Sequence, residues 1–106
     1  MTKYLYTFGY CTPQQAEAND LHGWDDEDSA GVLICATSER AAQDWGRSIA
    51  EEFLKRLYND RHASWAADGY GDGIELIPSE TYAVDQLQGI PEVQDGEFPD
   101  WTTLLG

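Results

Sequence analysis

The segment GVLICATSERAAQDWGRSIAEEFLKRLYN, residues 31–59, decides the fold of this chain. It opens with a continuous apolar run, residues 31–37, which is typical of a strand that lies centrally in a sheet or is covered on both faces. Ser38 then supplies a helix N-cap. Apolar residues follow at spacings of three and four, the pattern of a helix that buries one face: Ala42, Trp45, Ile49, Phe53 and Leu57. The segment therefore predicts a central strand followed by a long amphipathic helix over residues 39–59.

Two further features of this helix concern its faces. Gly46 and Ala50 lie four residues apart beside the apolar stripe, so we expect the helix to approach the sheet closely there; a docking groove for a partner is the alternative. The opposite face carries acidic residues one turn before basic ones, which favours ion pairs on a solvated surface. These pairs are Glu51 with Lys55 and Glu52 with Arg56.

The N-terminal segment predicts a strand and a short surface helix. Residues 3–11 alternate with period two, so that one face collects aromatic side chains. Thr12 and Pro13 are typical of a helix N-cap followed by proline at the first helical position, and they predict a helix over residues 14–19. Residues 20–30 predict an acidic loop that faces solvent or a partner, because adjacent like charges repel one another. The aromatic face of the strand consists of Tyr4, Tyr6, Phe8 and Tyr10.

Past the long helix, residues 64–67 fit a short strand or a turn. A glycine-rich loop, residues 68–73, separates them from a strand over residues 74–77 that Pro78 closes, and the pattern favours a hairpin across the loop.

The remaining segments give weaker signals. Residues 81–87 fit a strand or one helical turn, and residues 90–99 predict an irregular segment. Trp101, Leu104 and Leu105 are expected to pin the tail to the body. The element order predicts an α+β fold with a small, mostly antiparallel sheet and one long amphipathic helix packed on it.

Length and composition limit the class of protein. The chain has 106 residues, enough for one domain over residues 1–106, and 42% of them are hydrophobic, more than a disordered acidic tail would contain. The formal net charge is −14, which excludes nucleic-acid binding through basic patches. The charge sums to −5 over residues 1–38, to zero over residues 39–62 and to −9 over residues 63–106. The acidity therefore lies outside the long helix.

Targeting and redox signals are few. The N-terminus lacks a basic region followed by a long apolar run, and no stretch approaches the roughly 18 apolar residues of a membrane span. Cys11 and Cys35 lie in apolar stretches without metal-ligand spacing, so buried thiols are expected. We expect a cytoplasmic protein without a cofactor.

The charge distribution favours a basic protein as the partner, since an acidic surface steers such partners and meets grooves built for phosphates. Trp24, Trp65 and Trp101 lie outside the helical stripe, and Trp24 precedes a run of four acids, an arrangement typical of an aromatic anchor rimmed by charge. The alternative is that Trp24 packs its loop onto the body of the protein. We expect a non-enzymatic inhibitor that occupies a basic groove of a nucleic-acid-handling toxin, nuclease or defence effector, as a nucleic-acid mimic would. In size and charge alone the chain resembles small acidic immunity or anti-defence proteins. The expected contact residues are Trp24, Asp25, Asp26, Glu27 and Asp28, with Asp68 and Asp72 as a second group.

Three alternatives stay open. The loop from Asp68 to Glu75 shares an Asp, a second Asp and a following glycine with calcium loops, although Tyr70 and Ser79 stand where ligands are needed. An enzyme using His22 or Glu75 lacks a supporting catalytic motif. The acidity could also serve solubility alone.

Overall fold

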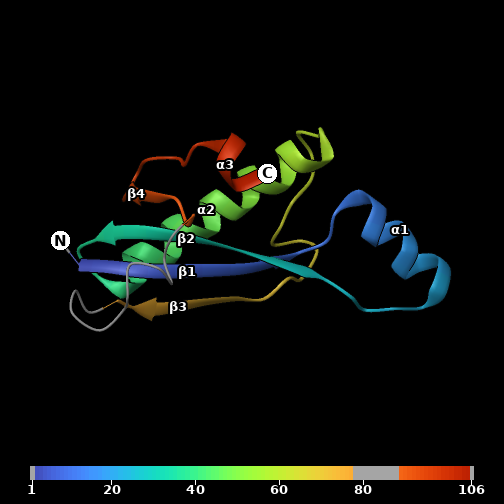
Figure 1. Ribbon diagram of the computed structural model, residues 1–106, viewed down its shortest axis with the longest axis horizontal. Coiled ribbons are helices and arrows are strands. Elements are labelled where there is room, and N and C mark those ends of the chain that lie inside the picture. Colours follow the sequence, from blue (N-terminus) through green and yellow to red (C-terminus); the bar gives the residue numbers. More distant parts are fainter. Residues whose placement is uncertain (1, 78–88, 106) are drawn as a thin grey trace.

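The computed structural model describes residues 2–77 and 89–105. The predicted segment 81–87 and the closing role of Pro78 lie outside the described residues. Figure 1 shows the arrangement of the helices and strands. In chain order these are β1 (Thr2–Tyr10), α1 (Pro13–His22), β2 (Asp28–Ala36), α2 (Glu39–Tyr58), β3 (Asp72–Leu76), β4 (Glu92–Gln94) and α3 (Trp101–Leu105).

The described strands form a four-stranded sheet in the order β3-β1-β2-β4. β1 pairs antiparallel with both β2 and β3, whereas β2 pairs parallel with β4. The α+β fold, with one long helix on a mostly antiparallel sheet, is therefore confirmed. β4 was not predicted as a strand: only three residues pair there, too few to show a period.

The predicted hairpin between residues 64–67 and 74–77 is wrong. β3 pairs with β1 instead, with Ile74 opposite Tyr6. Residues 65–69 form turns. The backbone N–H groups of Trp65 and Ala66 donate to the Glu51 carboxylate at 3.2 and 2.8 Å, so this segment satisfies them without a partner strand.

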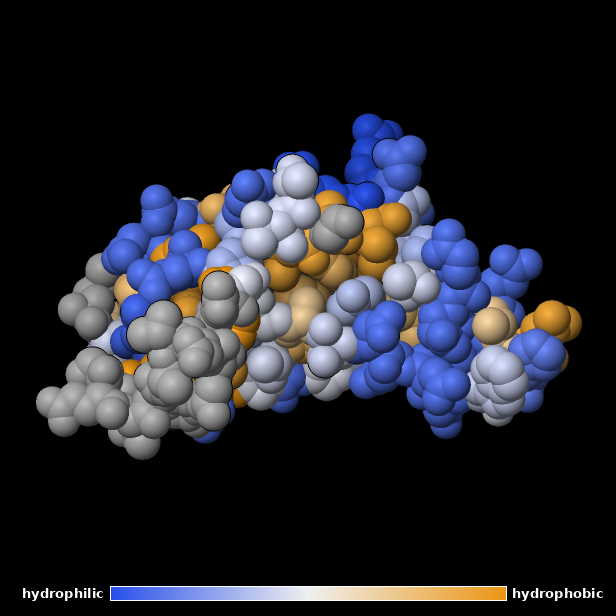
Figure 2. Space-filling view, in the orientation of Figure 1, coloured by the Kyte–Doolittle hydropathy of each residue, from blue (hydrophilic) through white to orange (hydrophobic). Residues whose placement is uncertain are grey.

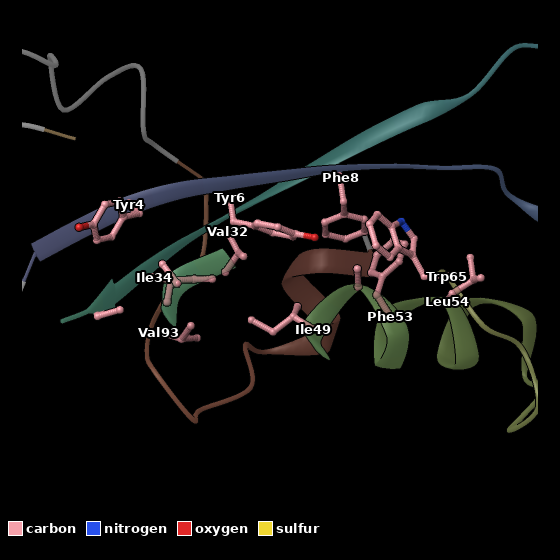
Figure 3. Packing of buried hydrophobic residues seen from close by; sticks show 13 residues of the cluster. Tyr4, Tyr6, Phe8, Val32, Ile34, Ile49, Phe53, Leu54, Trp65 and Val93 are labelled. Carbon is pink, nitrogen blue, oxygen red and sulfur yellow. The ribbon is translucent and has the colours of Figure 1, made fainter. Parts of the chain in front are cut away.

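The strand register places the aromatic face of β1 against α2. Tyr6 lies opposite Val32 of β2 and Ile74 of β3, and directly opposite side chains share one face of a sheet. α2 packs on this face and contacts β1, β2 and β3. Figure 3 shows the side chains of both layers meeting between the sheet and the helix. The cluster includes Tyr4, Tyr6, Phe8, Val32, Ile34, Ile49, Phe53, Leu54, Trp65 and Val93.

Gly46 lets α2 lie close to the sheet. It is buried in the helix, and a Cβ atom at this position would overlap the ring of Tyr6. Ala50, one turn later, is fully buried. The predicted close approach at these two small residues is confirmed.

Both predicted helix starts are confirmed. The Thr12 hydroxyl accepts from the backbone N–H of Gln15 at 3.0 Å, and the Ser38 hydroxyl accepts from Ala41 at 3.1 Å. α1 continues to His22, where Gly23 ends it in the left-handed conformation. The predicted loop over residues 20–30 is therefore shorter, because β2 already begins at Asp28.

Two tryptophans differ from the sequence interpretation. Trp65, which lies outside the helical stripe and was grouped with Trp24, is only 4% exposed and donates from Nε1 to the carbonyl of Gly9 at 2.8 Å. Trp45, assigned to the core, is partly buried at its margin and donates to the Glu97 carbonyl at 2.7 Å. Of the cysteines, Cys11 is buried as expected and Cys35 is only partly so.

Trp101 and the two leucines of α3 pack against the core cluster, as predicted for the tail. Across residues 2–77 and 89–105, none of the helices combines the length and apolar character needed to cross a membrane.

Candidate functional site

The connection between β1 and β2 projects from the body as an arm. We call residues 11–27 the α1 arm; it begins and ends beside the last strand pair, Tyr10 with Asp28. Figure 1 shows α1 extending beyond the end of the sheet, away from α2 and α3. α1 has no buried residue, so this helix adds little to the core. α1 is therefore a surface helix, and the arm is buried at its base, where Cys11 lies.

The tip of the α1 arm carries large apolar side chains in solvent. Leu21 is 77% exposed and Trp24 is 52% exposed. The ring of His22 stacks on Trp24, with centroids 4.4 Å apart and planes inclined by 22°. Figure 2 shows hydrophobic surface at the far end of the arm, set among hydrophilic residues. Such an exposed apolar group within a polar rim is typical of a protein interface.

Sequence reasoning identified Trp24 and missed Leu21. Leu21 is the only large aliphatic residue of α1, and it follows no helical stripe. A single leucine in an otherwise polar helix was the available signal, but the sequence could not show whether the body covers it.

Hydrogen bonds hold the base of the α1 arm. The Asn19 amide donates from Nδ2 to the carbonyl of Asp26 at 2.7 Å, and the Cys11 thiol donates to the same carbonyl at 3.2 Å. The Gln15 amide donates to Asn19 Oδ1 at 2.9 Å, and the backbone N–H of Trp24 donates to the Asn19 carbonyl at 3.0 Å. Asn19 thus ties the helix to the loop that carries Trp24.

The acidic run after Trp24 is exposed but does not form one face. Asp25 and Asp26 lie in the loop. Glu27 turns its carboxylate over Gly9, on the face of the sheet away from α2. Asp28 lies opposite Tyr10 in the register and so shares the α2 side. The carboxylates of Glu27 and Asp28 therefore lie at the base of the arm, on opposite sides of the sheet.

The second predicted group, Asp68 and Asp72, separates into two environments. Asp68 is exposed in the turn before β3. The Asp72 side chain is only 11% exposed, pairs with Arg47 at 2.9 Å and accepts from the Tyr6 phenol at 2.9 Å. Burial alone would raise the pKa of the Asp72 carboxyl, but hydrogen bonds from Arg47 and Tyr6 outweigh it and lower that pKa. Burial and this carboxylate raise the pKa of the Tyr6 phenol. Asp72 therefore has a structural role, and we leave it out of the candidate site.

The loop from Asp68 to Glu75 does not enclose a metal site. Asp72 lies opposite Phe8 on the α2 side of the sheet, whereas Glu75 lies opposite Leu5 on the other side. Within the part of the chain that the structure describes, no three His, Cys, Asp or Glu side chains come together as a metal site would need. The geometry thus gives the calcium alternative no support.

The basic side chains are mostly used within the molecule. Among residues 2–77 and 89–105, four of the six Lys and Arg residues form ion pairs with carboxylates at 2.6–3.4 Å. The two pairs predicted along α2 are among them. The positive charge is thus largely neutralised locally, while the acidic run of the arm stays exposed.

No protein-family model, no curated protein and no solved structure matches this chain.

Proposed function

We propose that this protein is a non-enzymatic binding protein whose α1 arm docks on a basic surface of a partner protein. The partner class that we favour is a nucleic-acid-handling toxin, nuclease or defence effector, which the bound arm would inhibit by covering its basic groove. One observation carries the proposal: an arm without a buried helix residue exposes Leu21 and Trp24 directly beside the run from Asp25 to Asp28.

The apolar tip supports affinity. Fully burying a side chain of this size contributes about 1.5–3 kcal/mol, and binding hot spots are enriched in tryptophan. Leu21 and Trp24 are both largely exposed in the free protein, so a partner that covers them gains most of this contribution. Asn19 fixes the loop before binding, which reduces the entropy lost on association.

The carboxylates support partner choice. A net charge of −14 accelerates encounter with a basic protein by about ten- to a thousandfold and disfavours acidic partners. Large basic surfaces are characteristic of proteins that neutralise phosphates. Glu27 and Asp28 point to opposite sides of the sheet. The acidic run from Asp25 to Asp28 therefore does not resemble a line of phosphates, and it is better described as a set of carboxylates next to an apolar anchor.

Affinity capture with matched variants tests the proposal. Proteins retained from an extract of the source cell by the wild type, but not by a Leu21→Ala/Trp24→Ala double variant, are purified and titrated calorimetrically. We expect a basic partner whose affinity falls at least about a hundredfold in the double variant, with its nucleic-acid binding restored.

Charge variants provide the control. Asp25→Asn/Asp26→Asn should slow association and weaken its salt dependence, whereas Glu39→Gln/Asp44→Asn, which removes the same charge from α2, should affect association less. A partner bound equally by all variants, or only acidic partners, would contradict the proposal. If no protein distinguishes the wild type from the double variant, the proposed role of the α1 arm is wrong.

A further inference from the structure

A second surface, distant from the α1 arm, carries a row of three aromatic rings. Trp45 of α2, Phe98 of the β4–α3 connection and Trp101 of α3 follow one another, with centroid separations of 4.9 and 5.6 Å. The Trp45 indole donates to the Glu97 carbonyl at 2.7 Å, which fixes the connection against α2. Figure 1 shows β4 and α3 away from α1, and α3 contacts α2. We call these three residues the aromatic row.

One end of the aromatic row already binds a guanidinium group of this chain. The Arg56 guanidinium lies 4.9 Å from the centroid of the Trp101 ring. Its Nε also donates to the Glu52 carboxylate at 2.9 Å. Ring and carboxylate together thus hold one cation, an arrangement that suits arginine because its planar guanidinium stacks on aromatic faces.

The middle of the aromatic row offers the same chemistry without such a cation. Phe98 is 50% exposed, and for residues 2–77 and 89–105 the contact of Arg56 with Trp101 is the one cation–ring pair that the structure shows. Exposed carboxylates flank Phe98 on both sides in the chain, at Glu97 and Asp100. Both are held in place, because Glu97 accepts from the backbone of Gln94 at 2.8 Å and Asp100 accepts from Thr102 at 3.0 Å.

We infer that Phe98, with the Glu97 and Asp100 carboxylates, is a binding surface for an arginine side chain presented by a partner protein. Ring face and negative charge together select a cation, and the contact of Arg56 with Trp101 favours guanidinium over ammonium. This surface is separate from the α1 arm and requires no occupied arm. It would let a basic partner contact two sides of the molecule.

The test needs only the purified protein and short peptides. Two arginines between glycines form the probe, and the same peptide with citrulline is the neutral isostere. Binding is followed by NMR through the indole N–H signals of Trp45 and Trp101. We expect the arginine peptide to shift both signals in a saturable manner, and the citrulline peptide to shift neither.

A conservative variant separates recognition from folding. Phe98→Leu keeps apolar contact with both tryptophans but removes the ring face, and we expect at least a threefold loss of affinity for the arginine peptide, about what one exposed cation–ring contact supplies. Trp24→Ala should bind the peptide as the wild type does. Equal shifts with citrulline, equal affinity for a lysine peptide, or unchanged affinity in Phe98→Leu would overturn the inference. The proposal for the arm would stand after such a result, since it depends on other residues.

Discussion

The carboxylate of Asp72 accepts a hydrogen bond of 2.9 Å from the phenol of Tyr6, residues that are 66 positions apart in the chain. The same carboxylate pairs with Arg47 of α2 at 2.9 Å. One side chain on an edge strand thus connects β1, β3 and the long helix. Tyr6 is fully buried, so its hydroxyl group needs this acceptor within the protein.

We expect Asp72→Ala to lower the free energy of unfolding by about 1–3 kcal/mol, because it leaves the hydroxyl of Tyr6 buried without this acceptor. Tyr6→Phe removes the donor of the same hydrogen bond. The Asp72→Ala/Tyr6→Phe double variant should therefore lose less unfolding free energy than the sum of the two single losses. Arg47→Gln should cost at most about 1 kcal/mol, since Arg47 is half exposed. Urea denaturation of the wild type, the two single variants and their double variant measures the coupling between Asp72 and Tyr6. Strictly additive losses would show that the phenol finds another partner.

Acid should remove the contribution of Asp72. The pKa of its carboxyl is lowered in the folded chain, where hydrogen bonds from Arg47 and Tyr6 outweigh the effect of burial. The carboxylate therefore stabilises the fold above its unfolded pKa of about 3.9, and this contribution is lost as the pH falls through the lower folded pKa. The difference in unfolding free energy between wild type and Asp72→Asn should be constant from about pH 7 to pH 5 and shrink by about pH 3. Denaturation at these pH values checks the sign, and a difference that grows in acid would contradict it.

Glu51 should matter more than its neighbour Glu52. Its carboxylate accepts from the hydroxyl of Ser64 and from the backbone of Trp65 and Ala66, in addition to pairing with Lys55. Glu51→Gln should therefore cost about 1–2 kcal/mol and speed amide exchange in the turn that positions Trp65.

Glu52→Gln is the matched control, because Glu52 pairs with Arg56 at the surface of the helix, and it should cost about 0.3–0.5 kcal/mol. Equal losses for the two variants would mean that the turn is held by other contacts.

Gly46→Ala should destabilise the protein although alanine is the better helix former. The gain in helix propensity is about 1 kcal/mol, but the new methyl group meets the ring of Tyr6 in the core and costs about 1–3 kcal/mol. We expect a net loss of up to about 2 kcal/mol by urea denaturation. Ser48→Ala, at an exposed position of the same helix, should be neutral or slightly stabilising. A stabilised Gly46→Ala variant would show that α2 can move away from the sheet.

Asn19→Ala should loosen the α1 arm without unfolding the sheet. Loss of its bond to the Asp26 carbonyl should raise the exchange rate of the Trp24 amide by about five- to tenfold, while amides of β1 and β2 keep their protection. Gln14→Ala, an exposed change in the same helix, should leave both unchanged. Hydrogen exchange followed by NMR gives the answer residue by residue, and unchanged protection of Trp24 would show that Asn19 is not the residue that holds the loop.

Local periodicity determined much of the fold. The alternation along β1 and the helical stripe of α2 each show which side chains must be buried, and both elements were predicted. For α2 the prediction included its N-cap, the small residue Gly46 and the ion pairs along the helix. The exposure of the acidic run after Trp24 also followed from the sequence, because adjacent like charges are not packed in a core.

Tertiary structure alone decided how these parts combine. Three features depend on contacts between distant segments, which no local period encodes. β3 pairs with β1, and Asp72 is held by Arg47. Trp65 is buried, while Trp45 lies at the margin of the core. The same holds for Leu21: only the position of α1 beyond the sheet leaves it in solvent, and the register of β2 sends the carboxylates of Glu27 and Asp28 to opposite sides. The sequence thus determined which residues need burial or solvent, and the pairing of strands determined where each one meets a partner.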